Sequence, residues 1–285
     1  MNVLLATDLS EAGLKSVEGL CACGATGFER VTLLHVIDLD QYTAGGSIPG
    51  ITEWAHEELG KAAAKLRKRG FAVDIRVETG PVIDTIKTVA GEIGIDLVVA
   101  TNLGKGAVVG RLLGSTAERL PIATNLPVLI ERVEHDGEQW CRLGSASPFQ
   151  RILLGVDLDD GDVRALVSRV AGLPGIESLR VVHVVQDETG RVSAREGLGR
   201  SLSGIASGIA LESAVAVGDA AAQLLVQAQD FDATAIAIAA CRHGMMHRGV
   251  LGSVARTIAL HADRAVLLLP STSLRGLAHV GHTNR

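Results

Sequence analysis

The sequence predicts two tandem α/β units, each a five-stranded parallel sheet with helices on both faces. Three observations predict this fold class. Short runs rich in Val, Ile and Leu alternate with longer stretches of helical periodicity. The chain has 33 glycines and only 2% aromatic residues, which is typical of parallel sheets buried between helices. The same order of segments occurs twice within 285 residues, a length sufficient for two domains with separate cores.

The first unit contains five apolar runs of strand length, with helical stretches between them. Strands are expected at residues 3–7, 31–37, 73–77, 97–101 and 126–132, and helices at residues 14–21, 52–69, from Pro81 and from Ser115. Proline suits the first turn of a helix because the N–H it lacks would have no intrahelical partner there. Ser115 followed by Glu118 has the spacing of a capping box, which predicts that Ser115 begins the last helix as its cap.

The second unit repeats the first at nearly constant spacing. Residues 151–157 resemble residues 2–8, His183 occupies the place of His35, and the Leu-Gly-Ser run at 251–253 repeats the run at 113–115. We therefore predict a first domain at residues 1–133 and a second at residues 150–271. Polar residues between them, 134–149, are interpreted as a linker, and residues 272–285 as a flexible tail.

Composition and charge exclude several classes of protein. A net charge of −5 disfavours nucleic acid and anionic membrane surfaces as partners. No apolar run approaches the roughly 20 residues that span a bilayer, and the N-terminus lacks the features of a signal peptide. The cysteines at positions 21, 23, 141 and 241 show no disulfide framework. We expect a cytoplasmic protein.

A glycine-rich stretch from Gly104 to Thr116 is the main functional signal. It follows the fourth predicted strand and leads into the helix at Ser115. Such a loop presents backbone N–H groups, and with the positive end of the helix dipole it favours phosphate. It is not a Walker loop, because it lacks the Gly-Lys-Ser/Thr spacing. The stretch therefore predicts a phosphate site at a helix N-terminus.

Three motifs in order resemble the universal stress protein family. They are the Thr-Asp-Leu-Ser-Glu run ending the first strand, the Leu-Leu-His-Val-Ile-Asp run ending the second, and the loop after the fourth, with nine residues between Gly104 and the Gly114-Ser115 pair. The resemblance extends over both units, so the chain resembles a tandem member. It implies two Rossmann-like domains of the adenine nucleotide alpha hydrolase type, each with strand order 3-2-1-4-5.

The resemblance also implies an ATP site in the first unit, with Asp8 beside the nucleoside, Val36 against the base, and Mg²⁺ near Asp8 if it accompanies the phosphates. The implied site residues are Ala6, Thr7, Asp8, Val36, Ala100, Thr101, Gly104, Gly114, Ser115 and Thr116. Thr101 departs from the family pattern, which has glycine there. Its hydroxyl is a candidate donor to the ligand.

The second unit departs further from the pattern. The corresponding residues are Asp157, Val184, Gly244, Gly252 and Ser253. Cys241 takes the place of the first glycine of the family pattern. Seven residues separate Gly244 from Gly252, where the first unit has nine. Carboxylates at residues 157–162 oppose a bound phosphate, at a cost of roughly 1–4 kcal/mol for each unpaired charge at about 4 Å. We expect nucleotide in the first unit and an altered second unit.

Other interpretations of these residues remain open at this stage. Asp8 alternatively caps a helix, and Val36 alternatively packs in the core. Gly104, Gly106 and Gly110, with Glu131 after the next strand, also fit a nicotinamide-type fingerprint, although it follows the fourth strand and not the first. A metal site at Cys241, His243 and His247 lacks a second ligand pair elsewhere.

No motif for efficient catalysis occurs in the sequence. The expected function is therefore an ATP-binding regulatory protein of the stress response, with at most slow hydrolysis. The resemblance implies pairing through the fifth strands, within one chain or in a homodimer, and a protein partner that the sequence does not identify. The alternative is a tandem scaffold, or a binder of lipids or small molecules, without nucleotide.

Overall fold

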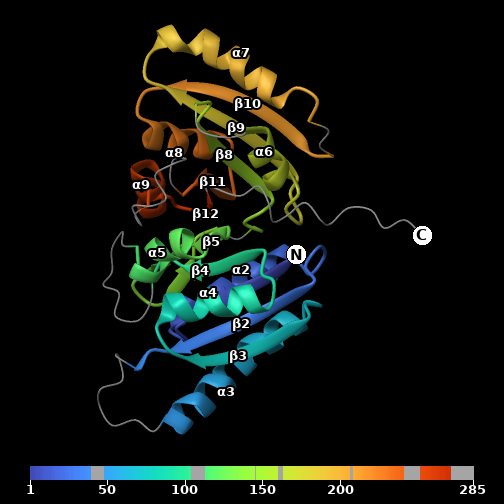
Figure 1. The fold of residues 1–285 in the computed structure, drawn as a ribbon, viewed down its shortest axis with the longest axis vertical. Coiled ribbons are helices and arrows are strands. Elements are labelled where there is room, and N and C mark those ends of the chain that lie inside the picture. Colours follow the sequence, from blue (N-terminus) through green and yellow to red (C-terminus); the bar gives the residue numbers. More distant parts are fainter. Residues whose placement is uncertain are drawn as a thin grey trace, which may run out of the picture.

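The computed structural model describes residues 1–39, 48–103, 113–144, 146–159, 163–205, 208–240 and 251–270. A ten-stranded sheet runs through the whole molecule, and helices cover both of its faces (Figure 1). The order of strands is β10-β9-β8-β11-β12-β5-β4-β1-β2-β3. Each half of this sheet comes from one half of the chain, which we name the first repeat (β1 to β5) and the second repeat (β8 to β12).

The first repeat follows the predicted alternation of strands and helices. In chain order its elements are β1 (Asn2–Ala6), α1 (Glu11–Leu14), α2 (Ser16–Cys23), β2 (Arg30–Ile37), α3 (Ile48–Arg67), β3 (Val73–Thr79), α4 (Val82–Glu92), β4 (Leu97–Thr101), α5 (Ser115–Ala123) and β5 (Val128–Glu131). All pairings within the repeat are parallel and give the order 3-2-1-4-5. The predicted fold of this half is confirmed.

The second repeat has the same order of elements and the same strand arrangement. Its elements are β8 (Arg151–Val156), α6 (Val163–Ala171), β9 (Ser178–Val185), a short 3-10 helix (Glu188–Gly190), α7 (Arg191–Leu202), β10 (Ala210–Val217), α8 (Ala220–Asp230), β11 (Ala235–Ala239), α9 (Ser253–His261) and β12 (Ala265–Leu269). Asp219 caps α8 by accepting a hydrogen bond from the Ala222 N–H, which explains the helix start after Gly218.

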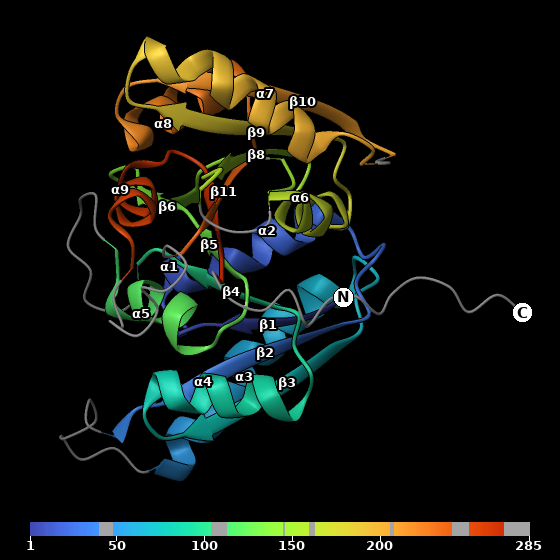
Figure 2. The same cartoon turned by 45° about the horizontal axis from the view of Figure 1, so that its top comes forward.

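The two repeats meet at their fifth strands, as the sequence analysis expected. β5 and β12 pair antiparallel, with Leu129 directly opposite Leu267. These two leucines hold equivalent positions in their repeats, so a local two-fold axis passes between them. On the same side of the molecule α5 lies near α9 (Figure 2), and Glu118 of α5 accepts a hydrogen bond from Arg256 of α9 at 2.8 Å.

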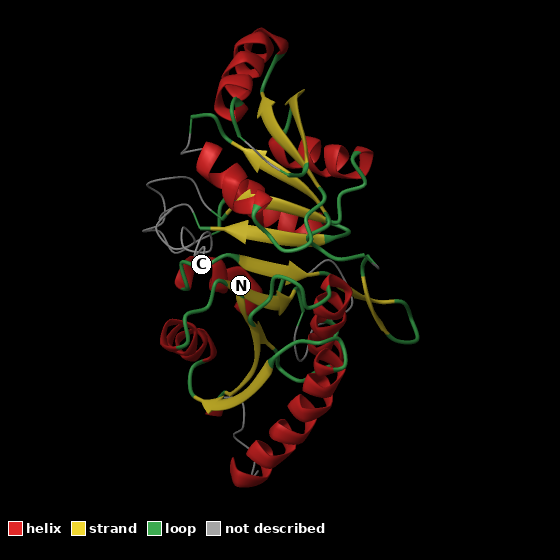
Figure 3. Cartoon of the chain, turned by 90° about the vertical axis from the view of Figure 1, so that its right-hand side faces the viewer, coloured by secondary structure: helices red, strands yellow, loops and turns green. Residues whose placement is uncertain are grey.

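Alternate residues of each strand supply two separate apolar cores, one on each face of the sheet. Val3 and Leu5 face α2 and α3, in a core that continues to α6 and α7. Leu4 faces the opposite side, where α4, α5, α8 and α9 pack. Figure 3 shows helices on both sides of the strands. This layering brings the carboxyl ends of the parallel strands to one edge of each half-sheet.

The segment interpreted as a linker contains regular structure. After β5 the chain forms a hairpin of two short antiparallel strands, β6 (Val133–His135) and β7 (Trp140–Arg142). We refer to residues 133–142 as the hairpin. It packs on the first repeat, where Val133 and Trp140 contact Ala12 and Leu103.

Candidate functional site

The carboxyl ends of β1 and β4 form the switch point of the first repeat. β1 pairs with β2 on one side and with β4 on the other, so the connections after β1 and β4 leave in opposite directions. Open α/β sheets bind ligands at such a point, because two loops diverge there and leave a crevice. Of the residues predicted for the first-repeat site, Ala6, Thr7 and Asp8 lie at the end of β1, and Ala100 and Thr101 lie at the end of β4.

The turn after β1 is organised by Asp8. Its Oδ1 accepts hydrogen bonds from the Ser10 N–H at 3.0 Å and the Ser10 hydroxyl at 2.6 Å. Ser10 Oγ in turn accepts from the Gly13 N–H at 3.0 Å, so Ser10 is the N-cap of α1. The alternative that Asp8 itself caps this helix is therefore wrong. Asp8 instead orients the residue that does.

Gly13 allows the Asp8 carboxylate to lie against the first turn of α1. A Cβ at position 13 would lie 2.3 Å from Asp8 Oδ1 and 2.9 Å from Thr7 Oγ1. Thr7 is buried, and its hydroxyl accepts a hydrogen bond from the Leu9 N–H at 3.1 Å. Leu9 has a positive φ of 60°, a conformation that few non-glycine residues adopt. The turn is therefore compact and fully specified by local contacts.

The helix after β4 begins at Ser115, one residue earlier than the predicted capping box requires. Its N-cap is Gly114, and Ser115 is its first helical residue. The predicted capping box is wrong, because Glu118 pairs with Arg256 in the second repeat and Ser115 lies inside the first turn. With glycine as the N-cap, no side chain of the cap covers the first N–H groups of α5.

Asn102 joins the start of the glycine-rich stretch to its end. Its carbonyl oxygen accepts a hydrogen bond from the Gly114 N–H at 2.7 Å, which closes the loop. Its own N–H donates to the Glu131 carbonyl at 3.0 Å. Thr101 is also engaged locally, since its hydroxyl donates to the Leu103 carbonyl at 2.7 Å. The threonine that replaces the family glycine therefore uses its hydroxyl within the protein.

An apolar surface lies beside these polar groups on the face covered by α4 and α5. Ala100 is buried there, and Ala6, Val36 and Leu113 are half-buried against the same core. On the opposite face His35 Nδ1 lies 2.9 Å from the Thr7 carbonyl oxygen. The predicted residues Ala6, Val36 and Ala100 thus share one face of the sheet, and His35 contacts Thr7 from the other face.

Some predicted residues lie outside the described part of the chain. Gly104 and the glycines at 106 and 110 are among them, as are Gly244, Cys241, His243 and His247. The alternative of a metal site at Cys241, His243 and His247, which the sequence did not favour, is therefore not tested. In the described ranges, no group of three His, Cys, Asp or Glu residues is arranged to hold a metal ion.

The two glycine-rich loops have the same length, which corrects the sequence interpretation. The Gly252 N–H donates to the Ala240 carbonyl at 2.8 Å, as the Gly114 N–H does to Asn102. Both hydrogen bonds enclose the same number of residues. In the strand registers Ala239 pairs with Leu269, as Thr101 pairs with Glu131 in the first repeat. Ala239 therefore corresponds to Thr101, and Cys241 does not stand at the position of the first glycine. The loop of the second repeat is therefore not shortened, and Gly244 does not stand at the position of Gly104.

The turn after β8 repeats part of the turn after β1 in the described residues. Asp157 Oδ1 accepts a hydrogen bond from the Asp159 N–H at 3.1 Å. His183 Nδ1 lies 3.0 Å from the Val156 carbonyl oxygen, which matches the contact of His35. Val184 is half-buried, like Val36. Ser253 begins α9, but the next residue is Val254, which lacks the hydroxyl of Thr116.

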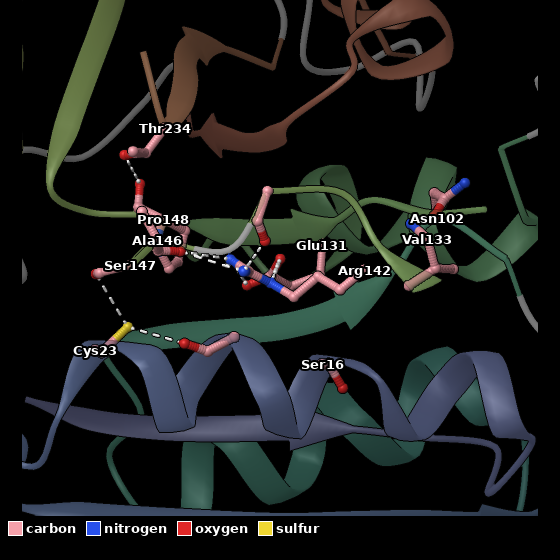
Figure 4. Close-up of polar contacts among 12 residues, drawn as sticks. Ser16, Cys23, Asn102, Glu131, Val133, Arg142, Ala146, Ser147, Pro148 and Thr234 are labelled. Carbon is pink, nitrogen blue, oxygen red and sulfur yellow. Dashed lines mark hydrogen bonds and ion pairs between the residues drawn. The ribbon is translucent and has the colours of Figure 1, made fainter. Parts of the chain in front are cut away.

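Sequence reasoning missed a buried ion pair beside the first-repeat site. Glu131 is fully buried, and its Oε2 accepts a hydrogen bond from Arg142 Nε at 2.8 Å (Figure 4). Arg142 also donates to the carbonyl oxygens of Gly144 and Ala146. Burial raises the pKa of the Glu131 carboxyl, and the Arg142 guanidinium offsets part of that rise. Since Glu131 is enclosed and paired, it does not offer a carboxylate to a ribose, which removes the basis of the nicotinamide interpretation.

Comparisons with known proteins agree with this fold. The universal stress protein family model matches residues 1–132. A universal stress protein from Archaeoglobus fulgidus DSM 4304 has a TM-score of 0.69 and 23% identity, covering 95% of this chain and 98% of its own. A protein of unknown function from Pseudomonas aeruginosa PAO1 has a TM-score of 0.62 and 18% identity, covering 94% of this chain and 92% of its own.

A universal stress protein from Archaeoglobus fulgidus in complex with dAMP is 25% identical and covers 41% of this chain and 94% of its own. Its TM-score of 0.32 is too low to support an inference for this chain. No curated protein matches the chain. Within the described ranges, no helix has the length and apolarity needed to cross a membrane.

Proposed function

We propose that the first repeat binds an adenine nucleotide, because residues 1–132 match the universal stress protein family model. The proposed ligand is ATP with Mg²⁺, bound between the carboxyl ends of β1 and β4. The protein acts as a regulatory component of a stress response in the cytoplasm, and nucleotide occupancy shifts a conformational equilibrium. Catalytic turnover is not part of the proposal.

The observation that carries this proposal is the hydrogen bond from Gly114 to Asn102. It holds the N-terminus of α5 against the end of β4, next to the Asp8 turn of the neighbouring strand. The first turn of a helix has N–H groups without intrahelical acceptors, and its dipole favours an anion. A phosphate chain fits there, and Ser115 and Thr116 add hydroxyl donors in the first turn.

The nucleoside has a matching environment at the same strand ends. Ala6, Val36 and Ala100 provide an apolar surface for a base, and the Asp8 carboxylate is an acceptor for a ribose hydroxyl. Asp8 is partly exposed and already fixed in orientation by Ser10. A preorganised acceptor loses little conformational freedom on binding, which favours affinity.

The second repeat supports the nucleotide less well, although its loop is closed in the same way. Val254 replaces Thr116, and Arg242 stands at the loop position that corresponds to Gly104. The turn after β8 adds Asp159 beside Asp157, and both carboxylates repel phosphate. We therefore assign the nucleotide to the first repeat.

The test compares Gly114→Asp with the matched variant Gly252→Asp. Aspartate is a preferred N-cap, and Gly114 has a φ of −65°, so the variant is expected to fold and melt no earlier than wild type. The added carboxylate lies where phosphate would bind. Purified protein is denatured and assayed for released ATP by chromatography, and thermal melting is recorded with and without millimolar MgATP.

The expected result is a thermal shift with MgATP in wild type and in Gly252→Asp, and none in Gly114→Asp. Ligand at a hundredfold excess over Kd stabilises a protein by about 2.7 kcal/mol, which melting detects readily. Wild-type protein with neither released nucleotide nor a thermal shift would refute the proposal, and would favour a scaffold without nucleotide. Loss of the shift in Gly252→Asp alone would move the site to the second repeat.

A further inference from the structure

Asn102 is a buried polar residue at the centre of the first-repeat site. Its side chain is 1% exposed, and three hydrogen bonds meet at this residue. Its backbone binds Glu131 on the neighbouring strand and Gly114 at the start of α5. Its side-chain Oδ1 accepts a third hydrogen bond from the Val133 N–H at 2.7 Å, so it also binds the hairpin.

Ala240 of the second repeat is equivalent to Asn102, so a comparison of the two shows which contact the Asn102 side chain adds. Ala240 makes the same two backbone hydrogen bonds, to Leu269 at 2.7 Å and from Gly252 at 2.8 Å. Its side chain has no carboxamide, so it cannot accept a third hydrogen bond. The third hydrogen bond therefore belongs only to the repeat that we assign to the nucleotide.

The hairpin is a firm anchor for this contact. Arg142 at its end is bound to the buried Glu131, and the Leu143 N–H donates to the Arg132 carbonyl at 2.8 Å. Val133 packs with Leu103 and Ala12 against Trp140. Leu103 directly follows Asn102, so the hairpin holds the start of the glycine-rich stretch by an apolar contact and a hydrogen bond together.

We propose that Asn102 is a positioning residue of the nucleotide site, which fixes the N-terminus of α5 by holding the loop start to the hairpin. This inference rests on the proposed function. The side chain of Asn102 accepts a hydrogen bond from the Val133 N–H, and its backbone carbonyl accepts one from the Gly114 N–H. Fixing the side chain therefore fixes the carbonyl that places α5, and the phosphate donors are aligned before the ligand arrives.

The test removes the Asn102–Val133 hydrogen bond from either end. Asn102→Ala gives the first repeat the residue that the second repeat carries at this position, so it is expected to fold. Val133→Pro removes the N–H donor and leaves Asn102 in place. It also replaces the valine side chain, at the first residue of a strand where proline is tolerated. Thr234→Val is the control, because it removes side-chain hydrogen bonds to the backbone of Pro148 and Arg151 in the second repeat and leaves Asn102 and the hairpin unchanged.

The dissociation constants for MgATP and for adenosine are measured by calorimetry for each variant. We expect both single variants to bind MgATP about tenfold more weakly, the value of roughly one hydrogen bond, with adenosine unaffected. The double variant should lose no more affinity for MgATP than either single variant, because both substitutions remove the same hydrogen bond. Thr234→Val should bind both ligands as wild type does.

Equal losses for MgATP and adenosine would indicate general loosening and would overturn the positioning role. Wild-type affinity for MgATP in a folded Asn102→Ala variant would also overturn it. If wild type itself binds no nucleotide, the proposed function fails instead, so the two failures are distinguishable. Should Asn102→Ala not fold, Val133→Pro carries the test alone, with the same expected loss.

Discussion

Gly13 is the residue at which the structure makes the sharpest single prediction. The absence of a Cβ there lets the Asp8 carboxylate lie against α1, since a methyl group would lie 2.3 Å from its oxygen. We predict that Gly13→Ala displaces Asp8 and weakens nucleotide binding at least tenfold. It should also destabilise the fold by about 1–3 kcal/mol, as overpacking does. Isothermal titration and urea unfolding measure the two effects.

Gly60 is the matched control for this substitution. It lies in the interior of α3, and a Cβ added there would meet no atom within 4 Å. Gly60→Ala should stabilise the protein by about 0.5–1 kcal/mol, because alanine favours the helix more than glycine does. Nucleotide affinity should not change. If Gly13→Ala instead kept wild-type affinity, Asp8 would have no part in binding.

At the residue scale, sequence patterns located the ends of strands and helices but not the contacts made there. Asp8, Ser115 and Thr101 lie at strand and helix ends, as the sequence predicted. The sequence did not predict that Ser10 caps α1, that Gly114 caps α5, or that Thr101 binds Leu103. Each of these depends on backbone angles at the turn, and several side chains at one turn can serve equally well as a cap.

At the scale of elements, strands were predicted well because they are continuous apolar runs. β4 has the expected bounds, Leu97–Thr101, and the others differ by a few residues at their ends. The hairpin was missed because each of its strands has only three residues, too short for periodicity to show. The loop lengths were misjudged because glycines were aligned in place of the backbone hydrogen bonds that close the loops.

The hairpin depends on the buried pair of Glu131 and Arg142, which gives a second prediction. Arg142→Met leaves a buried carboxylate without its counter-charge, at an expected cost of about 3–5 kcal/mol near neutral pH. Burial raises the pKa of Glu131 in the folded state above its ordinary value. The folded protein then holds this proton more tightly than the unfolded chain, so stability is lost as pH rises through the raised pKa.

The destabilisation by Arg142→Met should therefore be larger at pH 7 than at pH 4, and urea unfolding at both values measures it. The second repeat has Leu269 at the position of Glu131, so Glu131→Leu combined with Arg142→Met is the control. Because buried ion pairs are often replaced by apolar residues at little cost, the double variant should recover most of the loss. A pH-independent loss in Arg142→Met would mean that the charge of Glu131 is not the cause.

At the scale of the molecule, the contact between Glu118 and Arg256 is expected to favour pairing of unlike repeats. These residues hold equivalent positions, one at the start of α5 and one at the start of α9, and meet near the local two-fold axis. A pair of first repeats would bring two glutamates together there, and a pair of second repeats two arginines. Like charges in such contacts are unfavourable, so the mixed pair is preferred.

We predict that separately produced halves, residues 1–144 and 146–285, assemble with each other in preference to themselves. β5 and β12 supply the shared sheet edge, and Arg132 adds a hydrogen bond to the Ala259 carbonyl at 2.7 Å. Native mass spectrometry of an equimolar mixture should show mainly the mixed dimer. Reversing the charge in one half, Glu118→Arg, should remove the preference for the mixed dimer when Arg256 is retained, because every pairing then brings two arginines together.

The covalent joining of the repeats has a further consequence for how each half tolerates change. In a symmetric homodimer every substitution occurs twice, once on each side of the axis, so a residue near that axis must be compatible with itself. In this chain a substitution occurs once. The covalent connection also keeps the two repeats at a high effective concentration. Each contact between β5 and β12 can therefore be weaker than in a dimer of separate chains. One half can therefore carry Asn102 and the hairpin while the other carries Ala240, within a single uninterrupted sheet.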